Sequence, residues 1–126
     1  MAKKTARQRA VKYADDQMSL YIRARDGRCV QCGKRDHLTN GHLITRGKYA
    51  TRWAEDNCYC QCTGCNMRHE YQPEIFTDWW IKKNGEDAYH TLVLRSNTPV
   101  KFTTQEIREI GDIYKGKLKE LENERD

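Results

Sequence analysis

Cys29-Val-Gln-Cys32 and Cys62-Thr-Gly-Cys65-Asn66-Met-Arg-His69 are the two segments that decide the fold of this chain. Each begins with a Cys-x-x-Cys pair, which presents two sulfur atoms to the same side of the backbone. Two such pairs, about thirty residues apart, supply the four thiolates of a tetrahedral Zn²⁺ site. The sequence therefore predicts a structural zinc ion bound by Cys29, Cys32, Cys62 and Cys65.

Further polar residues lie between and just after the two cysteine pairs. Asn40-Gly41-His42 and Asn57 lie between them, and Asn66 and His69 follow the second pair. This order resembles the His-Asn-His, or ββα-metal, nuclease motif, in which a structural zinc ion joins a strand pair to a helix. The resemblance implies an α+β fold, mostly α, with a small ββα zinc core and flanking helices.

Length and composition narrow the classes of protein. The chain of 126 residues is 37% hydrophobic and 33% charged, which predicts one domain with a thin core that a zinc ion would stabilise. It has no run of about 18 apolar residues, and its basic N-terminus has no apolar segment, so neither a membrane span nor a secretory signal is expected. We therefore expect a cytosolic protein. In the cytosol, six cysteines are better explained as metal ligands than as disulfides.

Positive charge is concentrated around the cysteine pairs. Residues 1–72 hold 14 Lys and Arg against 7 Asp and Glu, whereas residues 73–104 hold 4 against 4 and residues 105–126 hold 5 against 7. An excess of this kind suits a phosphate backbone. A lone basic run is more often a solvated surface, but its coincidence with the zinc motif favours nucleic acid, and DNA is the expected partner.

We expect one domain in three parts: residues 1–18 are a basic N-terminal arm with the start of a helix, residues 19–72 are a zinc-stabilised core that resembles His-Asn-His nucleases, and residues 73–126 are a helical C-terminal part. The first part is expected to be a basic arm, frayed over residues 1–9, that leads into an amphipathic helix from Ala10 to Asp26. The other elements are expected as strands over 37–44 and 57–62, a loop over 45–56, a helix capped by Thr63, helices over 74–83 and 86–95, and a terminal helix capped by Thr103 or Thr104.

Two pairs of residues admit both a structural and a functional interpretation. Trp79 and Trp80 lie at a helical spacing that is more typical of core residues than of aromatic rings that stack on bases. Cys58 and Cys60 alternate with Cys62 along a strand, so either one has the spacing to reach zinc. Small buried residues of the core are the commoner role for such cysteines.

Six segments look like the phage NinG (Rap) recombination proteins, and they span most of residues 19–121. The segments are Ser19-Leu-Tyr-Ile-Arg-Ala-Arg-Asp-Gly27, Cys29-Val-Gln-Cys-Gly33, Gly41-His-Leu-Ile-Thr-Arg-Gly47, Arg52-Trp-Ala-Glu-Asp-Asn57, Gln61-Cys-Thr-Gly-Cys-Asn66 and Phe102-Thr-Thr-Gln-Glu-Ile-Arg-Glu-Ile110. The part around Cys62 to Asn66 is also similar to the phage resolvase endonuclease VII. Cys58 and Cys60 depart from the family pattern.

The resemblance implies that the protein processes branched DNA and Holliday junctions during phage recombination. It would act in the cytoplasm of an infected or prophage-carrying bacterium, alongside phage or host recombination proteins. The expected activity is that of a metal-dependent, structure-specific DNA endonuclease.

Hydrolysis of a phosphodiester requires a base to activate water and a cation to stabilise the charge that develops on the phosphate and the leaving oxygen. We expect the catalytic set to be His42 as the base, Arg46 as the phosphate clamp and Asn57 as the residue that orients the His42 loop. Asn66, together with His69, is expected to hold Mg²⁺ or another divalent cation that keeps most of its waters.

Gly41 keeps a second hypothesis open, because many His-Asn-His nucleases carry a metal-binding aspartate immediately before the base. A zinc-stabilised protein that binds branched DNA and recruits recombination factors without cutting would need the cysteine pairs and the basic surface, but not His42 with Asn66. A zinc module for protein interactions is disfavoured, because the sequence lacks the second ligand set of a cross-brace.

A symmetric homodimer is a further expectation, because one active site cannot readily make both cuts that resolve a four-way junction. The terminal helix offers an apolar stripe as a seam, composed of Ile107, Ile110, Tyr114 and Leu121. The alternative is that this stripe packs against Trp79 and Trp80 within one chain.

Overall fold

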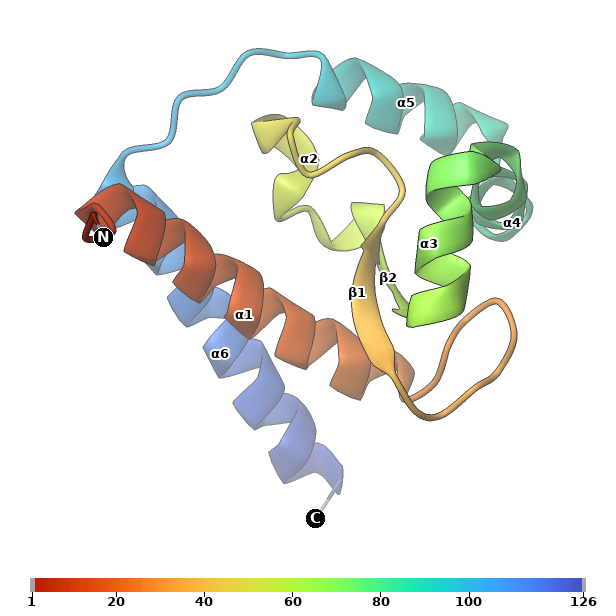
Figure 1. Cartoon of the computed structure of the whole chain (residues 1–126), viewed down its shortest axis with the longest axis horizontal. Coiled ribbons are helices and arrows are strands. Elements are labelled where there is room, and N and C mark those ends of the chain that lie inside the picture. The colour runs from red at the N-terminus through yellow and green to blue at the C-terminus, as the bar shows by residue number, and fades with distance from the viewer. Residues whose placement is uncertain (1, 126) are drawn as a thin grey trace.

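The molecule is built around two long helices and a small two-stranded hairpin (Figure 1). The computed structural model describes residues 2–125. Its elements, in chain order, are α1 (Ala6–Asp26), β1 (Leu38–His42), α2 (Tyr49–Arg52), the 3-10 helix η1 (Glu55–Asn57), β2 (Cys58–Cys62), α3 (Thr63–Tyr71), α4 (Pro73–Asn84), α5 (Glu86–Ser96) and α6 (Thr104–Arg125). The predicted α+β class, mostly α, is confirmed.

The strands β1 and β2 form an antiparallel hairpin that leads directly into α3. Its register pairs Leu38 with Cys62 and His42 with Cys58. Because directly opposed residues share a face of an antiparallel pair, His42 lies on the same face as Cys58. The predicted cap Thr63 is wrong by one residue: Cys62 is the N-cap of α3, and its sulfur accepts a hydrogen bond from the Cys65 backbone N–H at 3.4 Å.

Helix α1 begins earlier than the sequence predicts. Thr5 and Gln8 form a capping box, in which the Thr5 hydroxyl accepts from the Gln8 N–H and the Gln8 side chain accepts from the Thr5 N–H. The predicted frayed arm is therefore wrong over residues 6–9, because the cap satisfies donors that would otherwise favour fraying. The helix ends at Gly27, whose φ of 72° is the left-handed conformation that glycine adopts at low cost.

The predicted loop over residues 45–56 is also wrong, because it contains α2 and η1. Both are too short to show a hydrophobic period, and tertiary contacts hold them. The ring of Tyr49 lies edge-on to Trp53 at 5.6 Å, and the Trp53 indole N–H donates to Asp15 on α1 at 2.9 Å. Trp53 is thereby placed in the main core.

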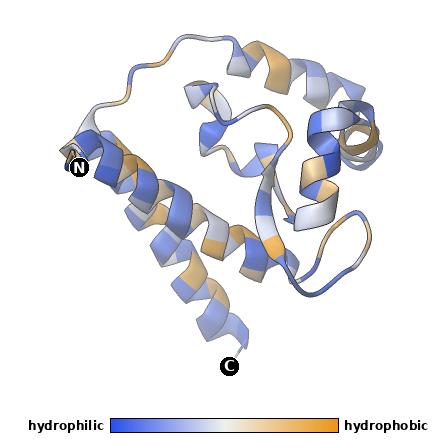
Figure 2. Cartoon of the chain, viewed as in Figure 1, coloured by the Kyte–Doolittle hydropathy of each residue, from blue (hydrophilic) through white to orange (hydrophobic). Residues whose placement is uncertain are grey.

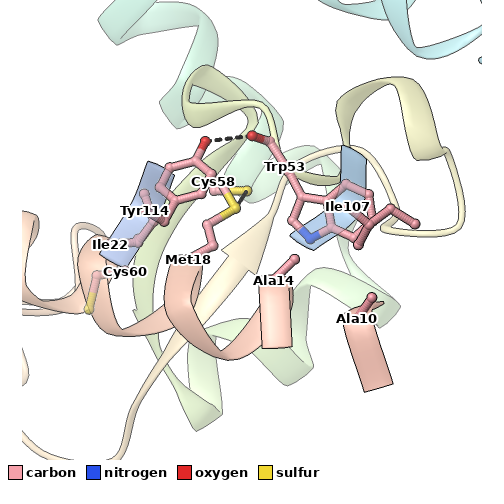
Figure 3. Close-up of a cluster of buried hydrophobic side chains, with 9 residues drawn as sticks. All are labelled: Ala10, Ala14, Met18, Ile22, Trp53, Cys58, Cys60, Ile107 and Tyr114. Carbon is pink, nitrogen blue, oxygen red and sulfur yellow. Dashed lines mark hydrogen bonds between the residues drawn. The ribbon is translucent and has the colours of Figure 1, made fainter. Parts of the chain in front are cut away.

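The main core lies between α1, β2 and α6 (Figure 3). Its buried members are Ala10, Ala14, Met18, Ile22, Trp53, Cys58, Cys60, Ile107 and Tyr114. Cys58 places its sulfur 3.9 Å from that of Met18, and both Cys58 and Cys60 are fully buried. The interpretation of these two cysteines as buried core residues is confirmed.

A second, smaller core lies between β2, α4 and α5. Trp80 and Phe76 are fully buried in it, and the partly buried Trp79 lies edge-on to Tyr59 at 5.0 Å. The Trp80 indole N–H donates to the backbone carbonyl of Asp56 at 2.8 Å. The prediction that both tryptophans belong to the core is confirmed.

Helix α6 lies beside α1 and runs in the same direction. The Tyr13 hydroxyl of α1 donates to Asp112 at 2.6 Å, and further along the pair Tyr114 donates to the Trp53 carbonyl while Lys117 bonds Glu55 at 2.8 Å. Figure 2 shows short hydrophobic segments alternating with hydrophilic ones along both helices, as expected for helices buried on one side.

The apolar stripe of α6 faces its own chain. Ile107 and Tyr114 are buried against α1 and Trp53, and Ile110 is partly buried beside them. The stripe is therefore not a free dimer seam, and the alternative contact with Trp79 and Trp80 is wrong as well. The sequence could not select α1 as the partner, because α1 and Trp79 offer similar apolar surfaces. Among residues 2–125, none of the helices has the length and apolarity to span a membrane.

Candidate functional site

Four cysteine sulfurs meet where the loop after α1 approaches the junction of β2 and α3. The ligand atoms of Cys29, Cys32, Cys62 and Cys65 all lie within 4.8 Å of one another, and the sulfurs of Cys32 and Cys62 are 3.7 Å apart. Two sulfurs bound tetrahedrally at about 2.3 Å from one zinc would lie about 3.8 Å apart. The donor set and its spacing thus fit a structural Zn²⁺, as the sequence predicts.

A tight turn shapes the first half of this cysteine cluster. The Gly33 N–H donates to the Cys29 carbonyl at 2.9 Å, and Gly33 has a φ of 80°, which favours glycine at this position. Burial opposes ionisation of the Cys29 thiol, but hydrogen bonds from the backbone of Cys62, Cys32 and Gln31 outweigh it and lower the pKa of Cys29 to about 7. A thiol with this pKa readily supplies a thiolate ligand.

Cys58 and Cys60 lie outside the cluster, and their environment keeps them protonated. Burial raises the pKa of Cys58 strongly and that of Cys60 to about 11. Position, however, is what separates them from the zinc-type cysteines: both are fully buried in the main core, and neither belongs to the group of four residues whose sulfurs lie within 4.8 Å of one another.

His42, the last residue of β1, has a fixed ring orientation. Its Nε2 lies 2.9 Å from the backbone carbonyl oxygen of Arg52. A carbonyl only accepts hydrogen bonds, so Nε2 must carry the proton and Nδ1 keeps the lone pair in the neutral ring. Burial lowers the pKa of His42, against the opposing effect of the Arg52 carbonyl, so the neutral form that can act as a base is favoured near pH 7.

Asp15 of α1 anchors the side chain of Arg52, the residue whose backbone carbonyl orients His42. The two carboxylate oxygens of Asp15 accept from Nε and Nη2 of Arg52 at 3.0 and 2.6 Å, and one also accepts from Trp53. The Arg52 guanidinium lies 5.2 Å from the centroid of the Tyr49 ring. Sequence reasoning missed Asp15, because it lies 27 positions before His42 and nothing in the local pattern of α1 distinguishes it.

Asn57 fixes the segment that follows His42. Its side chain is completely buried, donates to the carbonyls of Ile44 and Thr51 at 3.0 and 3.1 Å, and accepts from the Ile44 N–H at 2.9 Å. Both amide donors are therefore engaged by backbone groups. Asn57 thus joins the segment after His42 to α2, and its role in the function of the site stays a prediction.

One cleft of about 810 Å³ brings together the other predicted residues. His42, Arg46, Asn66 and His69 all line it, between α1, β1, the loop after β1, and α3. Three carboxylates that the sequence analysis did not assign line the same cleft, namely Asp15, Asp16 and Glu70. Cations and anions thus face one solvent-filled space, as a site that binds both a phosphate and a metal ion requires.

His69 also connects α3 to the end of β1. Its Nε2 lies 2.9 Å from the Leu43 carbonyl oxygen, and its ring lies edge-on to Phe76 at 5.1 Å. The carbonyl requires a proton on Nε2, which leaves a lone pair on Nδ1, and this buried atom has no hydrogen-bond partner within residues 2–125. Nδ1 is therefore the one nitrogen of His69 with the chemistry of a ligand.

Gly41 is required by the side chain of Gln61, which lies diagonally across the hairpin on β2, where it is paired with Thr39. A Cβ at position 41 would lie 1.9 Å from Oε1 of Gln61, which is completely buried and donates through Nε2 to Gln31. Gln61 thus fills the space that an acidic side chain before His42 would need. Carboxylates reach the cleft from α1 and α3 instead.

Comparisons with known proteins agree on one family. The family model described as the bacteriophage lambda NinG protein matches residues 2–124. The proteins named ninG of Escherichia phage 933W and Enterobacteria phage VT2-Sa are each 29% identical over 123 residues, which cover 91% of this chain. The chain spans 59% of the length of each of these relatives. No solved structure matches it.

Proposed function

This chain belongs to the NinG family of bacteriophage proteins, and from that premise we propose that it is a metal-dependent endonuclease that cuts branched DNA during phage recombination. The observation that carries the proposal is the geometry of His42. Its Nε2 is occupied by the Arg52 carbonyl, its Nδ1 lone pair is free to accept a proton, and its ring lines a cleft that also holds Arg46 and Asn66.

His42 acts in this proposal as the general base. Nδ1 takes a proton from a water molecule as that water attacks the phosphorus, and the Arg52 carbonyl stabilises the imidazolium that results, because it accepts the other ring N–H. The lowered pKa keeps the ring neutral before the reaction. Arg46, whose side chain is exposed at the rim of the cleft, binds a non-bridging phosphate oxygen.

Asn66, Glu70 and Nδ1 of His69 are the groups on α3 that would hold a divalent cation. An amide oxygen and a carboxylate are typical ligands of Mg²⁺, and His69 is a ligand better suited to softer divalent ions. When bound, such a cation supplies charge stabilisation at the phosphate and the leaving oxygen. The four cysteines have the separate role of joining the loop after α1 to the junction of β2 and α3. The motif as a whole is similar in order to His-Asn-His nucleases and, around Asn66, to endonuclease VII.

The test uses purified, zinc-saturated protein with a fluorescently labelled four-way junction and a linear duplex of the same arm sequence, in buffers with Mg²⁺, with Mn²⁺ or with no added divalent ion. We expect metal-dependent nicks near the branch point and little cutting of the duplex. His42→Ala should lower the single-turnover rate by about 10²–10⁴-fold while junction affinity stays near wild type, because a general base acts mainly in the transition state. Equal activity in His42→Ala would contradict the proposal.

A second candidate function is binding of branched DNA and recruitment of recombination proteins without cleavage. The observation that favours it is Gly41, where Gln61 excludes the acidic residue expected before the base. The same junction assay separates the two functions. Tight, specific binding with no nick under any divalent ion would favour the second one.

Two further parts of the proposal concern assembly and location. We propose that two copies act together on one junction, because two opposed cuts are needed, and the interface must be a surface other than the buried stripe of α6. The protein would work in the cytoplasm of the bacterial host with phage or host recombination proteins. Sedimentation of the protein with and without a junction would measure the copy number.

A further inference from the structure

A second groove, of about 540 Å³, adjoins the cleft that is lined by His42, Arg46 and Asn66. It lies between the first turns of α1 and the short helix α2. Asp15, Asp16 and Arg46 line both the cleft and this groove, so the two hollows meet along these residues. A chain molecule that enters the cleft beside Arg46 therefore also passes the edge of the groove.

The groove carries an excess of unpaired positive charge. Its two carboxylates are already engaged, Asp15 by Arg52 at 2.6 Å and Asp16 by Lys12 at 2.9 Å. The other cations that line it are Lys4, Arg7 and Arg46, all of them exposed. Within residues 2–125 these three form no ion pair with a carboxylate.

The groove wall is fixed before any ligand binds. The capping box of Thr5 and Gln8 holds the first turn of α1. Arg7 donates through Nη1 to the Phe102 carbonyl at 2.7 Å, and its guanidinium lies 5.9 Å from the centroid of the Tyr49 ring. Arg7 keeps further N–H donors beyond the one engaged, so its charge is positioned but not neutralised.

We propose that this groove binds the sugar-phosphate backbone of the duplex arm next to the cleaved bond, through Lys4 and Arg7. The inference rests on the proposed function, since it identifies the path of the DNA away from the site. Successive phosphates of one strand repeat about every 3.4 Å along a duplex, so a strand whose phosphate contacts Arg46 presents further phosphates toward the adjacent groove. A regularly charged polymer suits three unpaired cations spread over two adjacent hollows better than a single small anion does.

The test is the salt dependence of DNA binding by zinc-saturated Lys4→Gln/Arg7→Gln, measured by fluorescence anisotropy without added Mg²⁺ or Mn²⁺, with a labelled duplex and a four-way junction. Each lost phosphate contact should reduce the slope of log K against log salt by about 0.9. The double variant should thus lose about 1.8 from the slope. The ratio of wild-type affinity to double-variant affinity should therefore fall about tenfold as the salt concentration rises from about 50 to about 200 mM.

Lys115→Gln/Lys119→Gln is the matched control, because it removes the same charge from exposed positions of α6. It should leave the slope unchanged. An equal loss of slope in this control would show that the slope follows the net charge of the protein and not the position of the cations. That result would overturn the proposal that the groove binds DNA. Lys4→Gln alone, which breaks no side-chain contact found within residues 2–125, should still remove about 0.9 from the slope even if Arg7→Gln loosens the Phe102 contact.

The groove and the nuclease proposal fail in distinguishable ways. Binding is measured without added Mg²⁺ or Mn²⁺, so an altered slope supports the groove even if no condition yields cleavage. Normal cleavage with a slope unchanged in the double variant would overturn the groove and leave the nuclease proposal standing. If the protein does not cleave but binds DNA, and the double variant keeps the wild-type slope, other surfaces bind the DNA. That result would also overturn the groove proposal.

Discussion

Replacement of Gly41 by alanine tests how Gln61 shapes the site. The new Cβ would lie 1.9 Å from Oε1, 2.6 Å from Cδ and 2.9 Å from Cγ of Gln61. All three separations are shorter than a van der Waals contact, so the Gln61 side chain must move. It is completely buried, and its amide donates to Gln31, so movement requires both repacking and the loss of that hydrogen bond.

The expected cost follows from these two effects. Overpacking of a well-filled interior costs about 1–3 kcal/mol, and one lost hydrogen bond costs about 1 kcal/mol. Gly41→Ala should therefore reduce the free energy of unfolding by about 2–4 kcal/mol. For a domain of this length that is a fall in Tm of roughly 8–16 °C.

Urea denaturation of zinc-saturated protein, followed by circular dichroism, would measure the change. Gly47→Ala is the control, because the nearest atom to its new Cβ is the Thr45 hydroxyl at 3.8 Å, and it should change stability by less than about 1 kcal/mol. In a double-mutant cycle, Gln61→Ala should relieve the clash and give a coupling energy of about 1–3 kcal/mol. Wild-type stability for Gly41→Ala, or no rescue by Gln61→Ala, would refute this account of position 41.

The other predictions concern the metal, the base and its support. Metal analysis should find about one Zn²⁺ per chain, and Cys29→Ser should lose both the zinc and the cooperative unfolding transition, whereas Cys60→Ala should keep the zinc. Burial lowers the pKa of His42, so the cleavage rate should hold at about pH 6.5 and fall only as the pH drops through the lower folded value. The lowered pKa of folded His42 should also make the free energy of unfolding depend on pH. Its contribution should be full above about pH 6.5, the pKa of histidine in the unfolded chain, and should decline below that pH in urea titrations. His42→Ala should abolish this decline. Asp15→Asn should slow cleavage about tenfold in single-turnover assays, because it loosens Arg52, whose carbonyl orients His42. DNA binding should not weaken, because the change removes a negative charge from the cleft. A loss of affinity with an unchanged rate would contradict a positioning role.

Local sequence patterns determined the four-cysteine cluster, which could hold zinc, and most of the helices. Two Cys-x-x-Cys pairs admit few geometries, so Cys29, Cys32, Cys62 and Cys65 could be assigned from their spacing alone. The helices over 73–84, 86–96 and 104–125 follow from apolar periodicity and from caps such as the box formed by Thr103 and Glu106. His42, Arg46, Asn66 and His69 could be proposed together because their order relative to the cysteine pairs is itself a pattern.

Only the tertiary structure decided which distant residues meet. Asp15 reaches the site through Arg52, and Gln61 fills the space beside Gly41, yet neither contact has a period or a spacing that a sequence could display. The same holds for the α6 stripe, which packs against α1 although the two helices lie at opposite ends of the sequence. Backbone periodicity and ligand spacing are local properties of a chain, whereas the choice among similar apolar or polar partners depends on the free energy of the complete fold.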